Sequence, residues 1–194
     1  MAKIEEKVMA AFGTADEETR TYVMNLLGVD PRPVTETVKT MDDVMAELGE
    51  SHPLVVTYSR YLESTDIEMR DRHLMAYLKL RMVAEALNEG WHPQFTEDEK
   101  RYYPWLWLHK DKESAERLAE NDEYVFEIPD SLRAVLFGGN ANYGAYAGFA
   151  CSRSYNAPSN TYAYFGSRLC FKTRELVLHA ASTFTELWLE WFCM

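Results

Sequence analysis

Five of the nine glycines in this 194-residue chain lie in one short tract between Gly138 and Gly166. The tract is 29 residues long, and 23 of these are Gly, Ala, Asn, Ser or Tyr. It contains no Asp or Glu, although the whole chain carries a net charge of −11. Glycine adopts the left-handed backbone conformations that tight turns need, and tyrosine favours strands. The tract therefore predicts short strands and turns.

The chain before Gly90 predicts a helical N-terminal half, because its apolar residues recur at helical spacing. Caps and stops predict helices over Lys3–Phe12, from a Thr14 or Asp16 cap to Leu27, over Met41–Leu48 behind a Thr40 cap, over Pro53–Leu62 and over Thr65–Asn88. Between the second and third helices, Asp30-Pro31-Arg32-Pro33 predicts a linker, since two prolines at this spacing cannot continue a helix.

The rest of the chain predicts a mixed, strand-rich half. We expect strands over Tyr102–Leu108 and Tyr124–Ile128, with a charged helix or loop between them, short strands and turns from Leu132, and a further strand over Phe165–Phe171. Thr173 caps a final helix whose apolar face ends at Trp191. The sequence thus predicts an α+β fold with a helical region over residues 1–90 and a β-rich region over residues 91–194, closed by a terminal helix.

Two interpretations of the glycine-rich tract follow from its composition. Tyrosine supplies large rigid contact area, while Ser, Gly and Asn supply adaptable hydrogen bonds, a mixture that antibody loops use for binding. The alternative is an ordinary turn-rich sheet. A second aromatic group, Trp91, Tyr102, Tyr103, Trp105 and Trp107, predicts a core strand rather than a stacking platform, because apolar residues alternate along it and few basic residues are near.

Three segments resemble a known family. The stretch Phe137–Phe149, then Asn156-Ala157-Pro158-Ser159-Asn160, then Gly166-Ser167-Arg168 is similar to the end of a C-type-lectin-like domain of the formylglycine-generating-enzyme type. The resemblance is to the variable region of proteins targeted by diversity-generating retroelements. It implies a scaffold role for Gly138, Gly139, Gly166 and Arg168. It also implies a ligand-binding face made of Asn140, Asn142, Tyr143, Tyr146, Phe149, Arg153, Tyr155, Asn156, Asn160, Tyr162 and Tyr164.

A second resemblance covers more of the chain. Ala86–Trp91, Tyr102–Trp105 and Gly166–Lys172 are similar to uncharacterised proteins of Bacteroidales phages and prophages. Together the resemblances imply a non-catalytic phage protein that displays a lectin-like, variable face to a protein or glycan ligand. We expect a homo-oligomer in the virion or the host cytoplasm. The alternative is a cytoplasmic phage effector that sequesters a host small molecule or inhibits a host defence protein.

Several other functions find no support in the sequence. The acidic balance argues against binding a nucleic-acid backbone, and no apolar run is long enough to span a membrane. No zinc-protease, nucleotide-binding or serine-hydrolase motif is present, so we expect no enzyme, no catalytic residue, no cofactor and no metal. Calcium needs clustered carboxylates, which the tract lacks. Only Cys151 and Cys170 suggest an enzyme, by analogy with the paired-cysteine copper site of related oxidases.

Overall fold

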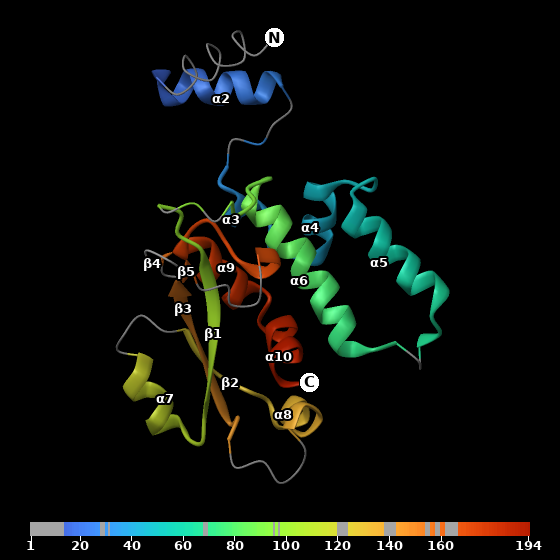
Figure 1. The fold of residues 1–194 in the computed structure, drawn as a ribbon, viewed down its shortest axis with the longest axis vertical. Helices are drawn as coiled ribbons and strands as arrows, with labels where there is room; N and C mark the ends of the chain where they lie inside the picture. Colours follow the sequence, from blue (N-terminus) through green and yellow to red (C-terminus); the bar gives the residue numbers. More distant parts are fainter. Residues whose placement is uncertain are drawn as a thin grey trace. The chain divides into compact units, whose positions relative to one another are not determined.

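The computed structural model describes residues 14–27, 30, 32–67, 70–94, 96, 98–119, 124–137, 143–153, 156–157, 160–161 and 167–194. Their helices and strands fall into two compact units, Met1–Thr37 and Val38–Met194. The second unit therefore includes elements from both sides of the boundary expected at residue 90. The architecture is α+β, as predicted: helices come first, a small antiparallel sheet follows, and two helices end the chain (Figure 1).

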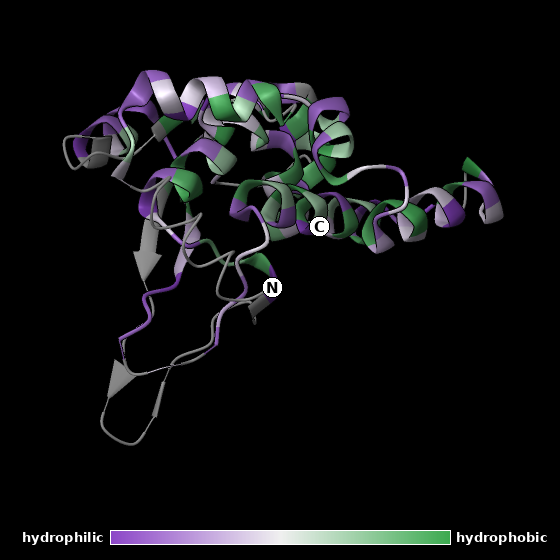
Figure 2. Cartoon of the chain, turned by 90° about the horizontal axis from the view of Figure 1, so that it is seen from above, coloured by the Kyte–Doolittle hydropathy of each residue, from purple (hydrophilic) through white to green (hydrophobic). Residues whose placement is uncertain are grey.

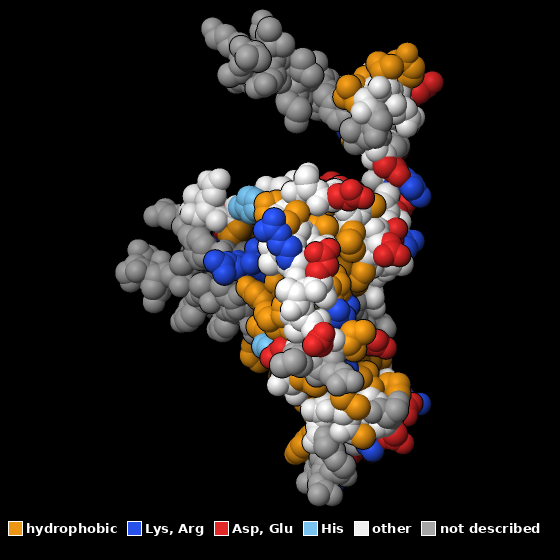
Figure 3. Space-filling view, turned by 90° about the vertical axis from the view of Figure 1, so that its right-hand side faces the viewer, with side chains coloured by type: hydrophobic (Ala, Val, Ile, Leu, Met, Phe, Trp, Pro, Cys, Tyr) orange, Lys and Arg blue, Asp and Glu red, His pale blue; other side chains and the backbone are white. Residues whose placement is uncertain are grey.

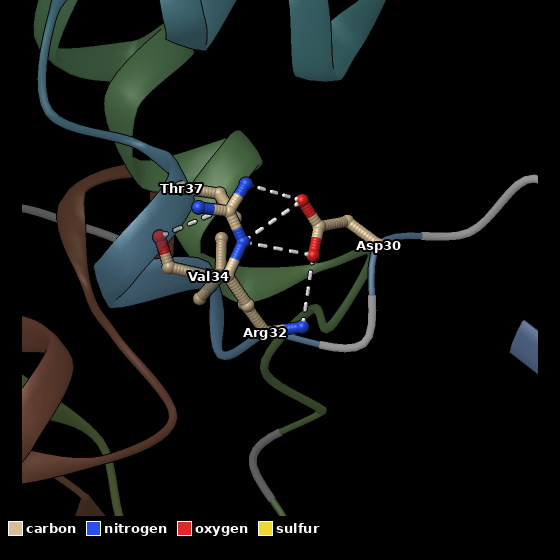
Figure 4. Close-up of polar contacts among 4 residues, drawn as sticks. All are labelled: Asp30, Arg32, Val34 and Thr37. Atoms are coloured by element: carbon tan, nitrogen blue, oxygen red, sulfur yellow. Dashed lines mark hydrogen bonds and ion pairs between the residues drawn. The ribbon is translucent and has the colours of Figure 1, made fainter. Parts of the chain in front are cut away.

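The first unit contains two described helices, α2 (Glu17–Leu26) and α3 (Val34–Thr37). Asp16 caps α2 by accepting a hydrogen bond from the Thr19 amide, which confirms the predicted start. The described residues of the predicted linker are not helical, and Arg32 there forms hydrogen bonds with Asp30 through its guanidinium and its own amide (Figure 4). These bonds hold the pKa of Asp30 down at about 2. The predicted helix Lys3–Phe12 lies outside the described residues.

The second unit opens with three helices, α4 (Met41–Leu48), α5 (Pro53–Ser64) and α6 (Arg72–Asn88). Thr40 and Asp43 form a reciprocal capping box at α4, as the Thr40 cap predicted. The long helix begins at Arg72 rather than at Thr65, because Asp71 caps it there and Arg70 bonds back to the carbonyls of Leu62 and Thr65. The start predicted for this helix was therefore wrong by seven residues.

Helix α6 is the centre of this unit and packs against α4, α5, α9 and α10 (Figure 1). Eight of its residues are buried, and they face several directions rather than one stripe: Ala76, Leu80, Met82, Val83, Ala84, Ala86, Leu87 and Asn88. A helix surrounded by packing partners is apolar on more than one side. Figure 2 shows that hydrophobic and hydrophilic residues alternate along the helices.

The sheet has the strand order β1-β3-β2, where β1 is Tyr102–His109, β2 is Tyr124–Glu127 and β3 is Tyr146–Arg153. Both outer strands run antiparallel to β3, so they are parallel to each other, and helix α7 (Lys112–Ala119) connects them. Two short strands, β4 (Asn156–Ala157) and β5 (Asn160–Thr161), form a separate ladder. The strands predicted over residues 102–108 and 124–128 are confirmed.

Three local predictions about the C-terminal half were wrong. Residues after Pro129 form helix α8 (Asp130–Phe137) rather than short strands, with Asp130 and Arg133 paired in its first turn. Within the predicted strand Phe165–Phe171, Ser167–Leu169 form a 3₁₀ turn, η2, and Phe171 bridges to Tyr102, while residues 165 and 166 lie outside the described residues. The terminal helix is two helices, α9 (Arg174–Thr183) and α10 (Thr185–Cys193).

The break between α9 and α10 has a local cause. The Thr185 hydroxyl donates hydrogen bonds to the carbonyls of Ala181 and Ser182, and Phe184 leaves helical geometry at φ −113° and ψ 37°. A threonine that bonds back to the preceding turn bends or interrupts a helix. The indole of Trp188 then donates to the Ala180 carbonyl across the break, which fixes the angle between the two helices.

One face of the sheet closes the core of this unit. Ala147 of β3 packs with Ile128, Leu136 and Leu189, and partly buried Leu106 and Leu108 of β1 join them. These contacts place α8 and α10 on the side of the sheet to which Leu106 and Leu108 point. Trp107, which lies between Leu106 and Leu108 on β1, points to the opposite face of the sheet.

Candidate binding surface on the sheet

The outward face of β1 carries two exposed tryptophans. Trp105 and Trp107 are 42% and 43% exposed, while Leu106 between them turns toward the core. The indole centroids lie 6.2 Å apart, with their planes at 56°. Tyr103, two residues earlier on the same face, is fully buried. The predicted core strand is therefore correct for Tyr103 and wrong for the two tryptophans, whose Trp-Leu-Trp-Leu alternation was the available signal.

The strand register leaves room beside both indoles. Trp105 is opposite Ala150 of β3, and Trp107 is opposite Gly148. Directly opposed residues of an antiparallel pair share a face of the sheet. Because these two residues are alanine and glycine, neither directly opposing position carries a large side chain. The result is an apolar patch on a hydrogen-bonded strand, which holds its contact groups in a fixed position.

Two described residues of the glycine-rich tract, Gly144 and Tyr146, lie at the His109 end of β1. The Gly144 amide donates to the His109 carbonyl at 3.0 Å, and Tyr146 pairs with His109 in the register. Gly144 has φ +90°, and a Cβ at this position would lie 2.6 Å from Phe137 Cε2. Only glycine fits both the backbone and the contact. Tyr143, immediately before it, is 62% exposed.

The predicted contact residues are distributed unevenly. Tyr143 is exposed and Tyr146 is partly buried. Arg153, Asn156 and Asn160 lie in β3, β4 and β5, where the structure describes their backbone only. Asn140, Asn142, Tyr155, Tyr162 and Tyr164 lie outside the described residues.

Phe149 is a correction to the predicted face. Its side chain is 0% exposed and stacks on Phe126 with 5.7 Å between ring centroids. On β3 it points the same way as Ala147, into the core, because residues two apart on a strand share a face. Phe149 therefore belongs to the scaffold and not to the contact set.

The described cysteines bear on the enzyme alternative. Cys170 is a free, buried thiol, and burial raises its pKa to about 11. Burial likewise raises the pKa of the free Cys193 thiol to about 11. A thiol bonds metals and reacts as its thiolate, and these two are protonated at neutral pH. In the part of the chain that the structure describes, no three His, Cys, Asp or Glu side chains are grouped as a metal site.

Among the described residues, no helix is long and apolar enough to cross a membrane. Comparison of the chain with protein-family models, with curated proteins and with solved structures gave no match.

Proposed function

We propose that this chain is a non-catalytic ligand-binding protein of a phage or prophage, and that it contacts a protein or glycan through the outward face of its sheet. The observation that carries the proposal is the pair Trp105 and Trp107, both exposed on a hydrogen-bonded strand. Tryptophan and tyrosine are enriched at the energetic centres of protein interfaces, where large rigid rings bury much area at small entropic cost. The acidic net charge of −11 opposes a nucleic-acid ligand.

A more specific part of this proposal is that the β-rich half of the chain is a C-type-lectin-like domain. It is supported by a small antiparallel sheet with exposed tryptophans on β1 and by an exposed Tyr143 next to Gly144, whose amide bonds to the His109 carbonyl at the end of β1. A homo-oligomer in the virion or the host cytoplasm also belongs to the proposal, because repeated copies of a weak site gain avidity. Phe149 is left out of the contact set.

The alternative is a cytoplasmic phage effector that sequesters a host small molecule or inhibits a host defence protein. Sequestration of a small molecule calls for a deep pocket. The hollow beside Arg81 and Arg168 has a volume of about 140 Å³. Pockets for small-molecule ligands typically measure roughly 300–1,000 Å³. Two larger hollows, of about 570 Å³ along α2 and about 560 Å³ beside Thr65 and Arg70, are open depressions of the surface rather than enclosed pockets. We therefore place display of an aromatic face ahead of sequestration.

The test is binding of the labelled protein to intact Bacteroidales cells and to a glycan array. Trp105→Ala with Trp107→Ala removes the proposed centre of the face, and we expect binding to fall at least about tenfold. The matched control is Val135→Ala, which truncates an exposed apolar residue on α8, away from β1. Both variants should keep the melting temperature of the parent, since the truncated side chains are exposed.

Two results would contradict the proposal. The first is binding by the double tryptophan variant that equals binding by Val135→Ala. The second is the absence of parent binding to both cells and glycans. A large fall in melting temperature in the double variant would instead assign the rings to the core.

A further inference from the structure

A small hollow lies between the C-terminal half of α6, residues 91–93 and η2. Its volume is about 140 Å³, and its lining includes Arg81, Glu85, Asn88, Trp91, His92 and Arg168. It is distinct from the outward face of β1, since neither Trp105 nor Trp107 contributes to it. Figure 3 shows one face of the molecule on which basic side chains gather beside a histidine and hydrophobic surface.

Two arginines converge at this hollow from distant parts of the chain. Arg81 lies on α6 and Arg168 on η2, and both guanidinium groups interact with the hydroxyl of Tyr77. Burial acts to raise the pKa of Tyr77, but the hydrogen bonds and charges of Arg81 and Arg168 outweigh it, so the pKa lies below its ordinary value. Two cations of the fold therefore meet within reach of a single oxygen atom.

Neither guanidinium is neutralised by an acid within the described part of the chain. Arg72, Arg101 and Arg133 pair with Glu190, Glu99 and Asp130, whereas Arg81 and Arg168 form no ion pair with any described carboxylate. A guanidinium has five N–H donors, so contact with one phenolic oxygen leaves most of them available. Positive charge at a partly enclosed hollow attracts an anion.

One acid, Glu85, also lines the hollow, so a single carboxylate stands beside the two guanidinium groups. Glu85 Oε1 lies 3.5 Å from Nε2 of His92, so its carboxylate is directed to the histidine. The aromatic support of the site is fixed as well, because Tyr77 packs on Trp191 of α10 with 5.1 Å between ring centroids. This contact holds the ring whose hydroxyl both guanidinium groups approach, and Trp91 adds an aromatic residue to the lining of the hollow.

We propose that Arg81 and Arg168 form a binding site for a phosphate group. The planar fork of arginine matches the oxygen spacing of phosphate, and two forks reach two sides of a tetrahedral anion. The hollow is small and takes the phosphate group itself, with any attached organic part lying against Trp91 or in solvent. The source is either free phosphate or the phosphoryl group of a phosphate monoester. This site lies beyond the sheet face and does not depend on it.

The test is calorimetric titration of the full chain with inorganic phosphate, with a nucleoside monophosphate and with acetate, at equal ionic strength. The variants are Arg81→Gln and Arg168→Gln. The control is Arg60→Gln, an exposed arginine of α5 outside the hollow. We expect phosphate to bind the parent and the control alike, and each pocket variant to lose more than about tenfold in affinity.

A second measurement separates loss of the site from loss of the fold. In both pocket variants the pKa of Tyr77 should rise, as followed by ultraviolet absorbance, while the far-ultraviolet spectrum stays that of the parent. Tighter binding of the monoester than of phosphate assigns the source to an ester, and the reverse assigns it to free phosphate. No binding to the parent at millimolar phosphate, equal binding by the pocket variants, or equal affinity for acetate would each overturn the proposal.

Discussion

At the scale of single residues, the strongest constraints are backbone geometry and short polar contacts. Gly49 and Gly144 both adopt left-handed φ values, +81° and +90°. A Cβ at Gly49 meets nothing within 4 Å, whereas a Cβ at Gly144 meets the ring of Phe137. Substitution of Gly49 therefore tests backbone strain alone, whereas substitution of Gly144 tests backbone strain together with steric overlap.

Gly144→Ala should destabilise the fold by about 2–5 kcal/mol, because a left-handed alanine costs about 1–2 kcal/mol and overpacking adds about 1–3 kcal/mol. Gly49 lies at φ +81° and ψ 153°, a region essentially restricted to glycine, so Gly49→Ala carries a backbone cost alone, about 1–3 kcal/mol. Urea denaturation of both variants measures the difference. Equal losses would show that Phe137 moves aside without cost.

Asp30 offers a pH-dependent prediction at the same scale. Its pKa is about 2 in the folded chain against an ordinary 3.8, because Arg32 donates to its carboxylate from both side chain and backbone. A lowered pKa means that the contact stabilises the turn fully above about pH 4 and loses this effect as the pH falls toward 2. Carboxyl carbon chemical shifts should titrate with that midpoint.

Arg32→Ala is the variant for this contact, and Glu36→Gln is its control on the neighbouring helix. The first should move the Asp30 midpoint upward toward 3.8, and the second should leave it in place. The shift stays incomplete, since the amide of residue 32 still donates to Asp30. An Asp30 midpoint near 3.8 in the parent chain would refute the contact.

At the scale of elements, Asn88 joins the end of α6 to the segment that leads into α9. Its amide donates to the Cys170 carbonyl at 2.8 Å, and its side-chain oxygen accepts from the Lys172 amide at 3.0 Å. The side chain is buried, so each bond satisfies a backbone group that water does not reach. The Asn88 side chain thus bonds the backbone of this segment as a neighbouring strand would.

Asn88→Ala should lower the free energy of unfolding by about 2–4 kcal/mol, because it leaves two buried backbone groups unsatisfied. The matched control is Lys172→Ala, which removes the exposed ion pair with Glu89 but keeps the backbone bond to Asn88. It should cost less than about 1 kcal/mol. Chemical denaturation compares the two, and similar losses would show that the buried amide contributes little.

At the scale of the whole molecule, the chain divides at Thr37 and Val38, far from the composition change near residue 90. The helical N-terminal elements α4, α5 and α6 belong with the sheet and the last two helices. His179 of α9 illustrates the reason, since its ring nitrogen lies 2.8 Å from the Val38 carbonyl. The amino-acid composition changes near residue 90, where the secondary structure changes from helical to mixed. The boundary between the two packed units lies elsewhere, between Thr37 and Val38.

A fragment of residues 38–194 should therefore fold without the preceding 37 residues. Its core is made within the unit, from α6, the sheet, α9 and α10, so we expect one cooperative thermal transition. Near-ultraviolet circular dichroism should show fixed aromatic side chains. A fragment of residues 91–194 is the comparison, and it should not fold, because it lacks α6. Cooperative melting of the shorter fragment would contradict this division.

The sequence by itself determined the helix caps at Asp16, Thr40 and Thr173, the strands β1 and β2 and the α+β order, because these depend on residues a few positions apart. Tertiary structure alone decided that Phe149 is buried while Trp105 is exposed, since both follow from which face of the sheet α8 and α10 cover. It also brought Arg81 and Arg168 together at Tyr77. Such contacts join residues far apart in sequence, and no local pattern records them.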